Sequence, residues 1–353
     1  MSSTASEVAW LNYVNVQMNR YFPLPFIILG TIGIILSIII FTRRSLFNNS
    51  CVQYLLANSL ANIVVIYWVA VTRIFSDGYA NDLSIRSNAF CRIRYFLTYY
   101  SRTLSTWFIL FACIDRWLSS NQARNRFNAV PFARKVILIT CIICFISYMH
   151  IFFLFNILQN PGSTSLTCYA NPGAYQTFSD MQYLICYALG PPVFMLIFGL
   201  LTLKNVRRNR RLVLPTTTNV PHQRSINRRD NQLLAMLVLQ VMIIIVFTVP
   251  FAIQKLVNNF TPATNQTSLA KAQYNLLTGI LRLVSYGSHA FGFYFYTLSA
   301  RIFRLELLRI INRIYRFFIG KDLFVLSGQT MFGMTLTKVD GSVTQTIGNY
   351  HER

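Results

Sequence analysis

The stretch from Val136 to Phe155 reads VILITCIICFISYMHIFFLF and identifies the class of fold. Its twenty residues include no Asp, Glu, Lys or Arg, and His150 is the only one that can carry a charge near neutral pH. A helix rises about 1.5 Å per residue, so this stretch would cross about 30 Å, the thickness of the hydrocarbon core of a bilayer. It is therefore typical of a transmembrane helix.

The whole chain repeats this pattern. Of its 353 residues 54% are hydrophobic and 12% charged, whereas an ordinary soluble domain has roughly 25% charged residues. The net charge is +22, from 32 Lys and Arg against 10 Asp and Glu. A nucleic-acid partner would fit that charge, but the arginines gather in short stretches between long uncharged segments. This alternation excludes a single soluble core and favours a multi-spanning membrane protein over a nucleic-acid-binding one.

Seven segments are long and apolar enough to cross a bilayer. They are Phe22–Thr42, Cys51–Val71, Phe90–Leu118, Lys135–Leu158, Met181–Leu203, Asn231–Leu256 and Gln273–Leu298. The predicted fold is an all-α integral membrane protein with a seven-transmembrane helix bundle over residues 22–299.

The basic residues predict the orientation, because cytoplasmic loops hold the excess of Lys and Arg. The densest stretches are Lys204–Arg229 and Arg301–Lys321, both on the same side of the predicted spans. We therefore expect residues 1–21 to be an extracellular N-terminus without a signal peptide, and residues 320–353 to be a polar, disordered cytoplasmic tail. Glycosylation sequons begin at Asn259 and Asn265, in a loop predicted to be extracellular. The expected location is the plasma membrane.

Two of the seven cysteines stand apart from the others, which lie in or at the edges of spans. Cys91 begins the third span on the outer side, and Cys168 lies in the extracellular loop between spans four and five. In an oxidising compartment a disulfide between them would tie this loop over the mouth of the bundle. Two free thiols are the alternative.

The inner end of the third span carries Asp115-Arg116-Trp117. The helix from Cys91 to Arg116 would be about 37 Å long, so the two residues would lie at opposite surfaces of the bilayer. With seven spans and the outer cysteine pair, this triplet at this distance resembles the rhodopsin-like (class A) G-protein-coupled receptors over about residues 22–318.

Other positions depart from that family. Thr248 stands where a tryptophan is usual, Gly292 and Phe293 replace part of an Asn-Pro-x-x-Tyr pattern, and Asn62 stands for an aspartate. The sequence therefore resembles a divergent branch of that family.

The resemblance implies a switch at the inner surface. In that family the arginine of the triplet, here Arg116, is held by its neighbouring acid, here Asp115, and often by an acid at the base of span six. Asp230 is the candidate for the second acid, and the alternative is that it only balances nearby arginines in water. Pro250, which is expected to kink the sixth span, and Tyr296 of the seventh span match the family as well.

A short amphipathic helix is predicted after the seventh span, over residues 300–319. Its apolar residues recur at helical spacing with arginines between them, which is typical of a helix lying on an anionic inner leaflet. It resembles the family's eighth helix. A calmodulin-binding segment is the alternative.

Two arginines inside the predicted spans indicate a ligand pocket, because a charge within a bilayer is costly unless it is paired or hydrated. Along their helices, Arg102 lies about 16 Å below Cys91 and Arg282 about 21 Å above Tyr296, so both fall in the outer half. Each belongs to a polar stripe at helical spacing. The predicted ligand-binding residues are Arg94, Thr98, Arg102, Arg282, Tyr286 and His289. For His289, a role as a hydrogen-bonded residue of the bundle is the stronger interpretation.

The partner of these arginines decides the chemistry of the ligand. The outer acids, among them Asp77, Asp82 and Asp180, fall in predicted loops or rims. An acidic group of the ligand is the favoured partner, with hydration and backbone carbonyls, or an acid from a folded-in loop, as alternatives. The hairpin-like loop Asn156–Asp180 resembles the lid of peptide receptors, so a short peptide is the favoured ligand.

Other functions find less support. No metal-spaced Cys/His cluster, phosphate loop or nucleophile elbow occurs, so no enzyme, cofactor or metal is predicted. A multi-span anion transporter or channel is the alternative, because arginines within a membrane would serve it too. Transporters usually carry an internal repeat, and none is visible. The expected partners are an extracellular ligand, a heterotrimeric G protein and anionic inner-leaflet lipids.

Overall fold

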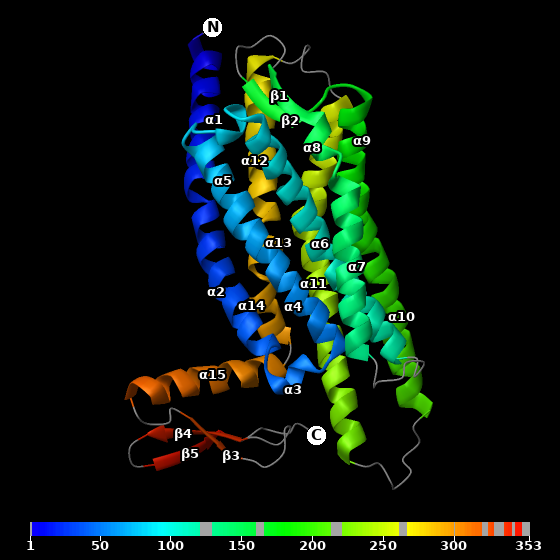
Figure 1. Cartoon of the computed structure of the whole chain (residues 1–353). Helices are drawn as coiled ribbons and strands as arrows, with labels where there is room; N and C mark the ends of the chain where they lie inside the picture. Colours follow the sequence, from blue (N-terminus) through cyan, green and yellow to red (C-terminus); the bar gives the residue numbers. More distant parts are fainter. Residues whose placement is uncertain are drawn as a thin grey trace.

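The computed structural model is a bundle of long helices that run roughly side by side, with a β-hairpin over one end (Figure 1). It describes residues 2–120, 129–159, 166–212, 221–260, 267–299, 301–319, 324–327, 335–340 and 343–347. Within helix α11, side chains are described from Leu237 to Val257. The bundle confirms the predicted all-α membrane fold.

The N-terminal half of the bundle contains four of the spans. The first is made of α1 (Ser2–Tyr21) and α2 (Pro23–Phe41), and the short α3 (Arg44–Phe47) leads to the second. The second joins α4 (Ser50–Val64), the π-helical turn η1 (Val65–Ala70), α5 (Val71–Arg73) and the π-helical turn η2 (Ile74–Gly78). After the 3-10 turn η3 (Leu83–Ile85), the third is α6 (Asn88–Ser120), and the fourth is α7 (Ala129–Tyr148) with α8 (Ile151–Leu154).

The second half supplies the other three spans. The fifth consists of α9 (Ala174–Tyr183), the π-helical turn η5 (Leu184–Leu189) and α10 (Gly190–Leu212). The sixth is α11 (Pro221–Phe260), and the seventh is α12 (Ser268–Ser285), α13 (Gly287–Ala290) and α14 (Gly292–Ser299). The amphipathic α15 (Arg301–Ile319) then lies across the lower end of the bundle, where an eighth helix is predicted (Figure 1).

Among the described residues, five helices are long and apolar enough to cross a membrane: Thr4–Phe41, Ser50–Gly78, Ala129–Leu154, Ala174–Val206 and Leu237–Val257. The third span, α6, is more polar because it carries buried arginines. The seventh span is divided into shorter helices by breaks at Tyr286 and Phe291. The apolar side chains on the outside of α7 are exposed, with Leu138 at 62% and Ile143 at 61%. An exposed apolar face of this kind is typical of a helix that contacts lipid.

Residues 1–21, predicted as an N-terminal segment before the first span, are helical from Ser2 as α1 and lead directly into α2. The ends of two other predicted spans bear on the site. The fourth helix ends at Leu154 rather than Leu158, because Phe155–Gln159 forms strand β1 and pairs antiparallel with β2 (Leu166–Ala170). The second span continues past Val71 to Gly78 through its two π-helical turns. A π turn adds a residue to the helical repeat and rotates the faces of the helix beyond it. This rotation changes which side chains of the second span face the neighbouring helices.

The tail differs from its prediction where the structure describes it. Residues 320–353 are predicted to be disordered, but β3 (Phe324–Ser327), β4 (Thr335–Asp340) and β5 (Val343–Ile347) form a three-stranded antiparallel sheet in the order β3-β4-β5. Their alternating Thr, Val and Leu side chains favour extended backbone.

Candidate functional site

An open pocket with a cavity volume of about 70 Å³ lies in the outer half of the bundle, under the β-hairpin. Its wall combines four cations with five tyrosines. The cations are Arg73, Arg102, Lys255 and Arg282, and the tyrosines are Tyr95, Tyr99, Tyr169, Tyr183 and Tyr286. Thr98 and two apolar residues complete the wall. Of the predicted ligand-binding residues, the structure therefore brings together Thr98, Arg102, Arg282 and Tyr286.

The Cys91–Cys168 disulfide is present and holds the hairpin over this pocket. The Cα atoms of the two residues are 5.7 Å apart, and Cys168 pairs with Ile157 in the ladder. Arg92 adds to the connection, because its Nε donates to the carbonyl of Phe155 at 3.0 Å. The hairpin is thus fixed both to the outer end of α6 and by its own ladder.

Arg102 is the cation of the pocket without a carboxylate partner among the described residues. Its side chain is 2% exposed. Its Nη1 donates to the hydroxyl of Tyr183 at 2.9 Å, and its guanidinium lies 4.9 Å from the centroid of the Tyr286 ring. In the described part of the chain, its Nε finds no hydrogen-bond acceptor. A buried guanidinium with only phenol partners retains capacity for an anion.

Arg282 differs, and here the sequence-based prediction of a ligand acid as its partner is wrong. Its Nη2 lies 2.5 Å from a carboxylate oxygen of Asp77 and 3.1 Å from Oδ1 of Asn19. Asp77 is also 3.6 Å from Arg73. The aspartate was expected in a loop, but the extension of the second span through η2 brings it beside α12. The alternative of a folded-in acid is therefore the one found.

Arg94 does not line the pocket. Its guanidinium pairs with Asp82 at 2.8 Å and also donates to the hydroxyls of Ser84 and Ser76. Asp82 in turn caps η3 by accepting from the backbone N–H of Ser84 at 2.9 Å. This arginine holds the loop between the second and third spans and is satisfied without a ligand.

Lys255 lines the pocket, although it was not among the predicted ligand-binding residues. Its ammonium lies 2.6 Å from Oδ1 of Asp180 and 2.5 Å from the hydroxyl of Tyr99. The rings of Tyr99, Tyr169 and Tyr183 face it as well, with centroids 4.8, 5.3 and 4.8 Å away. In the sequence, Lys255 lies next to the outer end of the predicted sixth span, Asn231–Leu256. Its position about one and a half helical turns after Pro250 was the available signal, since it puts the side chain at pocket depth.

The inner end of α6 carries the charged couple Asp115 and Arg116, both buried. Nη2 of Arg116 lies 2.7 Å from Oδ2 of Asp115 and 3.2 Å from Oδ1 of Asn49. The hydroxyl of Ser50 donates to both oxygens of Asp115, at 2.7 and 2.8 Å. Because Asn49 and Ser50 begin α4, the carboxylate lies at the N-terminus of a helix, where a negative charge is stabilised.

Residues 33–288 match the family described as 7 transmembrane receptor (rhodopsin family). The chain belongs to this family. It is therefore a multi-pass membrane receptor and not an enzyme. A comparison with curated proteins finds no match.

The receptor has a polar network at its centre, around Asn62. The hydroxyl of Ser105 donates to Oδ1 of Asn58 at 2.7 Å and of Asn62 at 2.8 Å. His289 joins it through Nδ1, 2.9 Å from Oδ1 of Asn62, and its Nε2 lies 3.2 Å from the hydroxyl of Tyr187. His289 therefore lies beneath the pocket rather than in its wall, as a hydrogen-bonded residue of the bundle.

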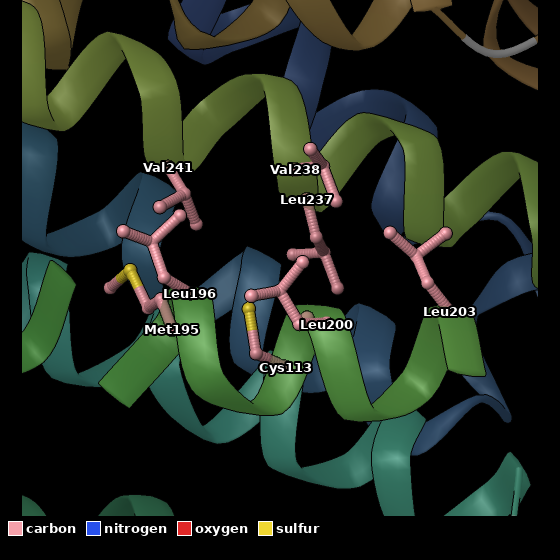
Figure 2. A pocket seen from close by; sticks show the side chains of 9 residues that line it. Cys113, Met195, Leu196, Leu200, Leu203, Leu237, Val238 and Val241 are labelled. Atoms are coloured by element: carbon pink, nitrogen blue, oxygen red, sulfur yellow. The ribbon is translucent and has the colours of Figure 1, made fainter. Parts of the chain in front are cut away.

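The receptor also has an apolar pocket with a cavity volume of about 50 Å³ in its inner half, between α6, α10 and α11. Figure 2 shows its wall, where Cys113 of α6 lies among leucine and valine side chains such as Leu200 and Leu237. This gap leaves α10 and α11 incompletely packed against each other at this level.

Several predicted residues fall where side chains are not described. These are Asp230 and Asn259, within α11, and Tyr296, within α14; Asn265 lies outside the described residues altogether. Pro250 is inside α11, close to the buried Thr248, whose hydroxyl has no partner among the residues that the structure describes.

Proposed function

We propose that this receptor binds an extracellular ligand with an acidic group, a short peptide, in the outer pocket and activates heterotrimeric G proteins. The observation that carries the proposal is Arg102, which is 2% exposed and has phenol partners but no ion pair with a described carboxylate. A buried cation is expensive to leave unpaired, so it is a functional site by default.

The charges of the pocket support an acidic ligand. Its wall has four cations, and two carboxylates lie close to them: Asp77 beside Arg73 and Arg282, and Asp180 beside Lys255. Two positive charges therefore remain in excess, and a ligand anion beside Arg102 would offset one of them.

The shape of the pocket supports a ligand of limited size. The cavity measures about 70 Å³, several times the roughly 10–15 Å³ that one water molecule needs, so it has room for a small group of a ligand. It would hold one end of a short peptide, and the disulfide-bound hairpin would cover the rest. The rival function, an anion channel or transporter, gains no support from membership in a receptor family.

The inner side supports coupling to a G protein. The Arg116–Asp115 pair would hold the arginine in the resting state, and a break in that pair would offer a cation to the partner. The incomplete packing between α10 and α11 would let α11 move. Asp230 is proposed as a further partner of Arg116, at the cytoplasmic base of α11.

The orientation and the lipid contacts are proposed from the distribution of charge. The basic inner loops would place the N-terminus outside and the C-terminus in the cytoplasm of the plasma membrane, where glycans on Asn259 and Asn265 would face the exterior. Helix α15 would lie on anionic inner-leaflet lipids.

The test is a screen of peptide and small-acid libraries on cells that express the receptor, with cAMP and calcium as readouts. An acidic hit should lose at least tenfold in potency on Arg102→Met at equal surface expression. Arg86→Gln is the matched control, because Arg86 is an exposed outer arginine away from the pocket wall. Equal loss on both variants, or none on either, would refute an anion site at Arg102.

A further inference from the structure

The surroundings of Lys255 have the composition of a binding site for an amine. Its ammonium lies between three tyrosine rings and one carboxylate, contributed by α6 (Tyr99), β2 (Tyr169) and α9 (Asp180 and Tyr183). Aromatic faces attract cations through their quadrupole, and a carboxylate adds a charge-assisted hydrogen bond. We call these four residues the tyrosine cage.

The tyrosine cage is held in shape by contacts other than those of the lysine. The hydroxyl of Tyr169 donates to Oδ1 of Asp180 at 2.7 Å. Burial raises the pKa of Tyr169 well above its usual range, so this hydroxyl keeps its proton and stays a donor. The rings of Tyr99 and Tyr183 pack at 5.1 Å between centroids. An amine other than that of Lys255 would therefore meet a preformed site.

The tyrosine cage and the proposed anion site share a residue. The hydroxyl of Tyr183 accepts the hydrogen bond from Arg102 at 2.9 Å, while its ring faces Lys255 at 4.8 Å. Both sites line the same pocket. A cationic and an anionic group on one small ligand could thus occupy the two sites on either side of one phenol.

Because Asp180 is buried, Lys255 can move away at low cost only if another cation takes its place. The carboxylate side chain is 2% exposed, and a buried charge that loses its partner costs several kcal/mol. A ligand anion that drew Lys255 away would break its ion pair with the buried Asp180 and put no other ammonium in its place. A ligand amine avoids this cost, because it replaces one ammonium by another.

We propose that the tyrosine cage is a second ligand subsite that takes a primary ammonium group, and that Lys255 occupies it until the ligand's amine displaces it. The inference rests on the proposed function and narrows it: the ligand carries an amine for the tyrosine cage as well as an acid for Arg102. The displaced Lys255, on the outer part of α11, no longer ties that helix to α6 and α9.

The test uses purified full-length receptor in lipid nanodiscs, with n-propylammonium as the probe and the melting temperature as the readout. Lys255→Ala removes the atoms that n-propylammonium replaces. We expect the probe to raise the melting temperature of this variant saturably, whereas n-propanol, which has the same shape without the charge, should not. In Lys255→Ala/Asp180→Asn the difference between the two probes should disappear.

The wild-type receptor tests displacement. A tethered group competes at an effective concentration in the millimolar range, so the wild-type response should need about 10- to 100-fold more n-propylammonium than Lys255→Ala. If Lys255→Ala responds equally to the amine and the alcohol, the tyrosine cage is not a cation site. If the wild type shows no saturable response at 100-fold higher concentration, Lys255 is not displaceable. Either result overturns the proposal.

A second variant covers the case in which Lys255→Ala does not fold. Lys255→Met keeps most of the stem and leaves space for the charged head alone, so ammonium chloride is then compared with sodium chloride, with the same two outcomes. None of these measurements depends on signalling. Failure of the tyrosine cage is therefore distinguishable from failure of the proposed receptor function, which the second-messenger screen tests.

Discussion

Arg102 and Arg94 should respond in opposite ways to the same substitution. Both are arginines of α6, separated by about two helical turns and nearly equally buried, at 2% and 3% exposed. Arg94 pairs with Asp82, whereas Arg102 has phenol partners. We predict that Arg102→Met leaves the stability of the receptor unchanged or raises it, and that Arg94→Met lowers it.

The contacts of Arg102 supply the magnitude for the first variant. Arg102→Met removes one hydrogen bond from a charged donor, about 1.5–3 kcal/mol, and a cation–π contact of about 2 kcal/mol. The substitution also removes the desolvation cost of a buried charge, several kcal/mol. It further removes a buried Nε that has no acceptor among the described residues. The net effect is between zero and about 2 kcal/mol of added stability.

The contacts of Arg94 predict a stability change of the opposite sign, a loss. Arg94→Met leaves Asp82 without its cation, and removing one partner of a buried ion pair usually costs about 3–5 kcal/mol. The side chain of Asp82 is 25% exposed, so water can replace part of the lost interaction. We therefore expect a loss of about 3 kcal/mol, the lower end of that range.

The assay is thermal unfolding of the purified receptor, followed with a thiol-reactive dye that reports exposure of the buried Cys51, Cys113 and Cys144. At about 2 °C per kcal/mol, the two variants should melt about 6 °C or more apart, with Arg102→Met the more stable. If the melting temperature of Arg102→Met is as low as that of Arg94→Met, then Arg102 stabilises the fold, which contradicts its assignment as an anion-binding residue.

Three further predictions concern other contacts. Cys91→Ser should cost about 2–5 kcal/mol of stability in the same melting assay, and the double variant with Cys168→Ser should lose no more; a second, additive loss would contradict a shared bridge. Asp77→Asn and Arg282→Met should couple by about 1–3 kcal/mol in a double-mutant cycle, and strict additivity would speak against their ion pair. Asp115→Asn should raise ligand-free cAMP or calcium signalling several-fold at equal surface expression, because it releases the neighbouring arginine; an unchanged baseline would count against the inner switch.

Part of the site could be predicted from the sequence because it depends on distance along one helix. Cys91 and Arg116 lie on α6, so their separation places one at each end of the third span, whatever the other helices do. Arg102 was found in the same way. The disulfide needed only that Cys168 lie on the same side of the bundle as Cys91.

The ion pairs of the pocket could not be predicted in this way. Asp77 meets Arg282 because two π-helical turns extend and rotate the second span, and a π turn has no sequence signature comparable to proline or glycine. Lys255 meets Asp180 across two helices whose relative rotation depends on side-chain packing. The same holds for Arg94, which looked like a ligand residue because its helical face is shared with Arg102.

The amino-acid pattern alone therefore establishes that the chain crosses a membrane as a helical bundle, because an apolar backbone segment in lipid must satisfy its own hydrogen bonds and a helix does so locally. The packed structure decides which of the cations has no carboxylate partner among the described residues. A carboxylate from another segment of the chain pairs with each of Arg282, Arg94 and Lys255, whereas Arg102 contacts tyrosines. That outcome depends on which faces of packed helices meet, and no single segment specifies it.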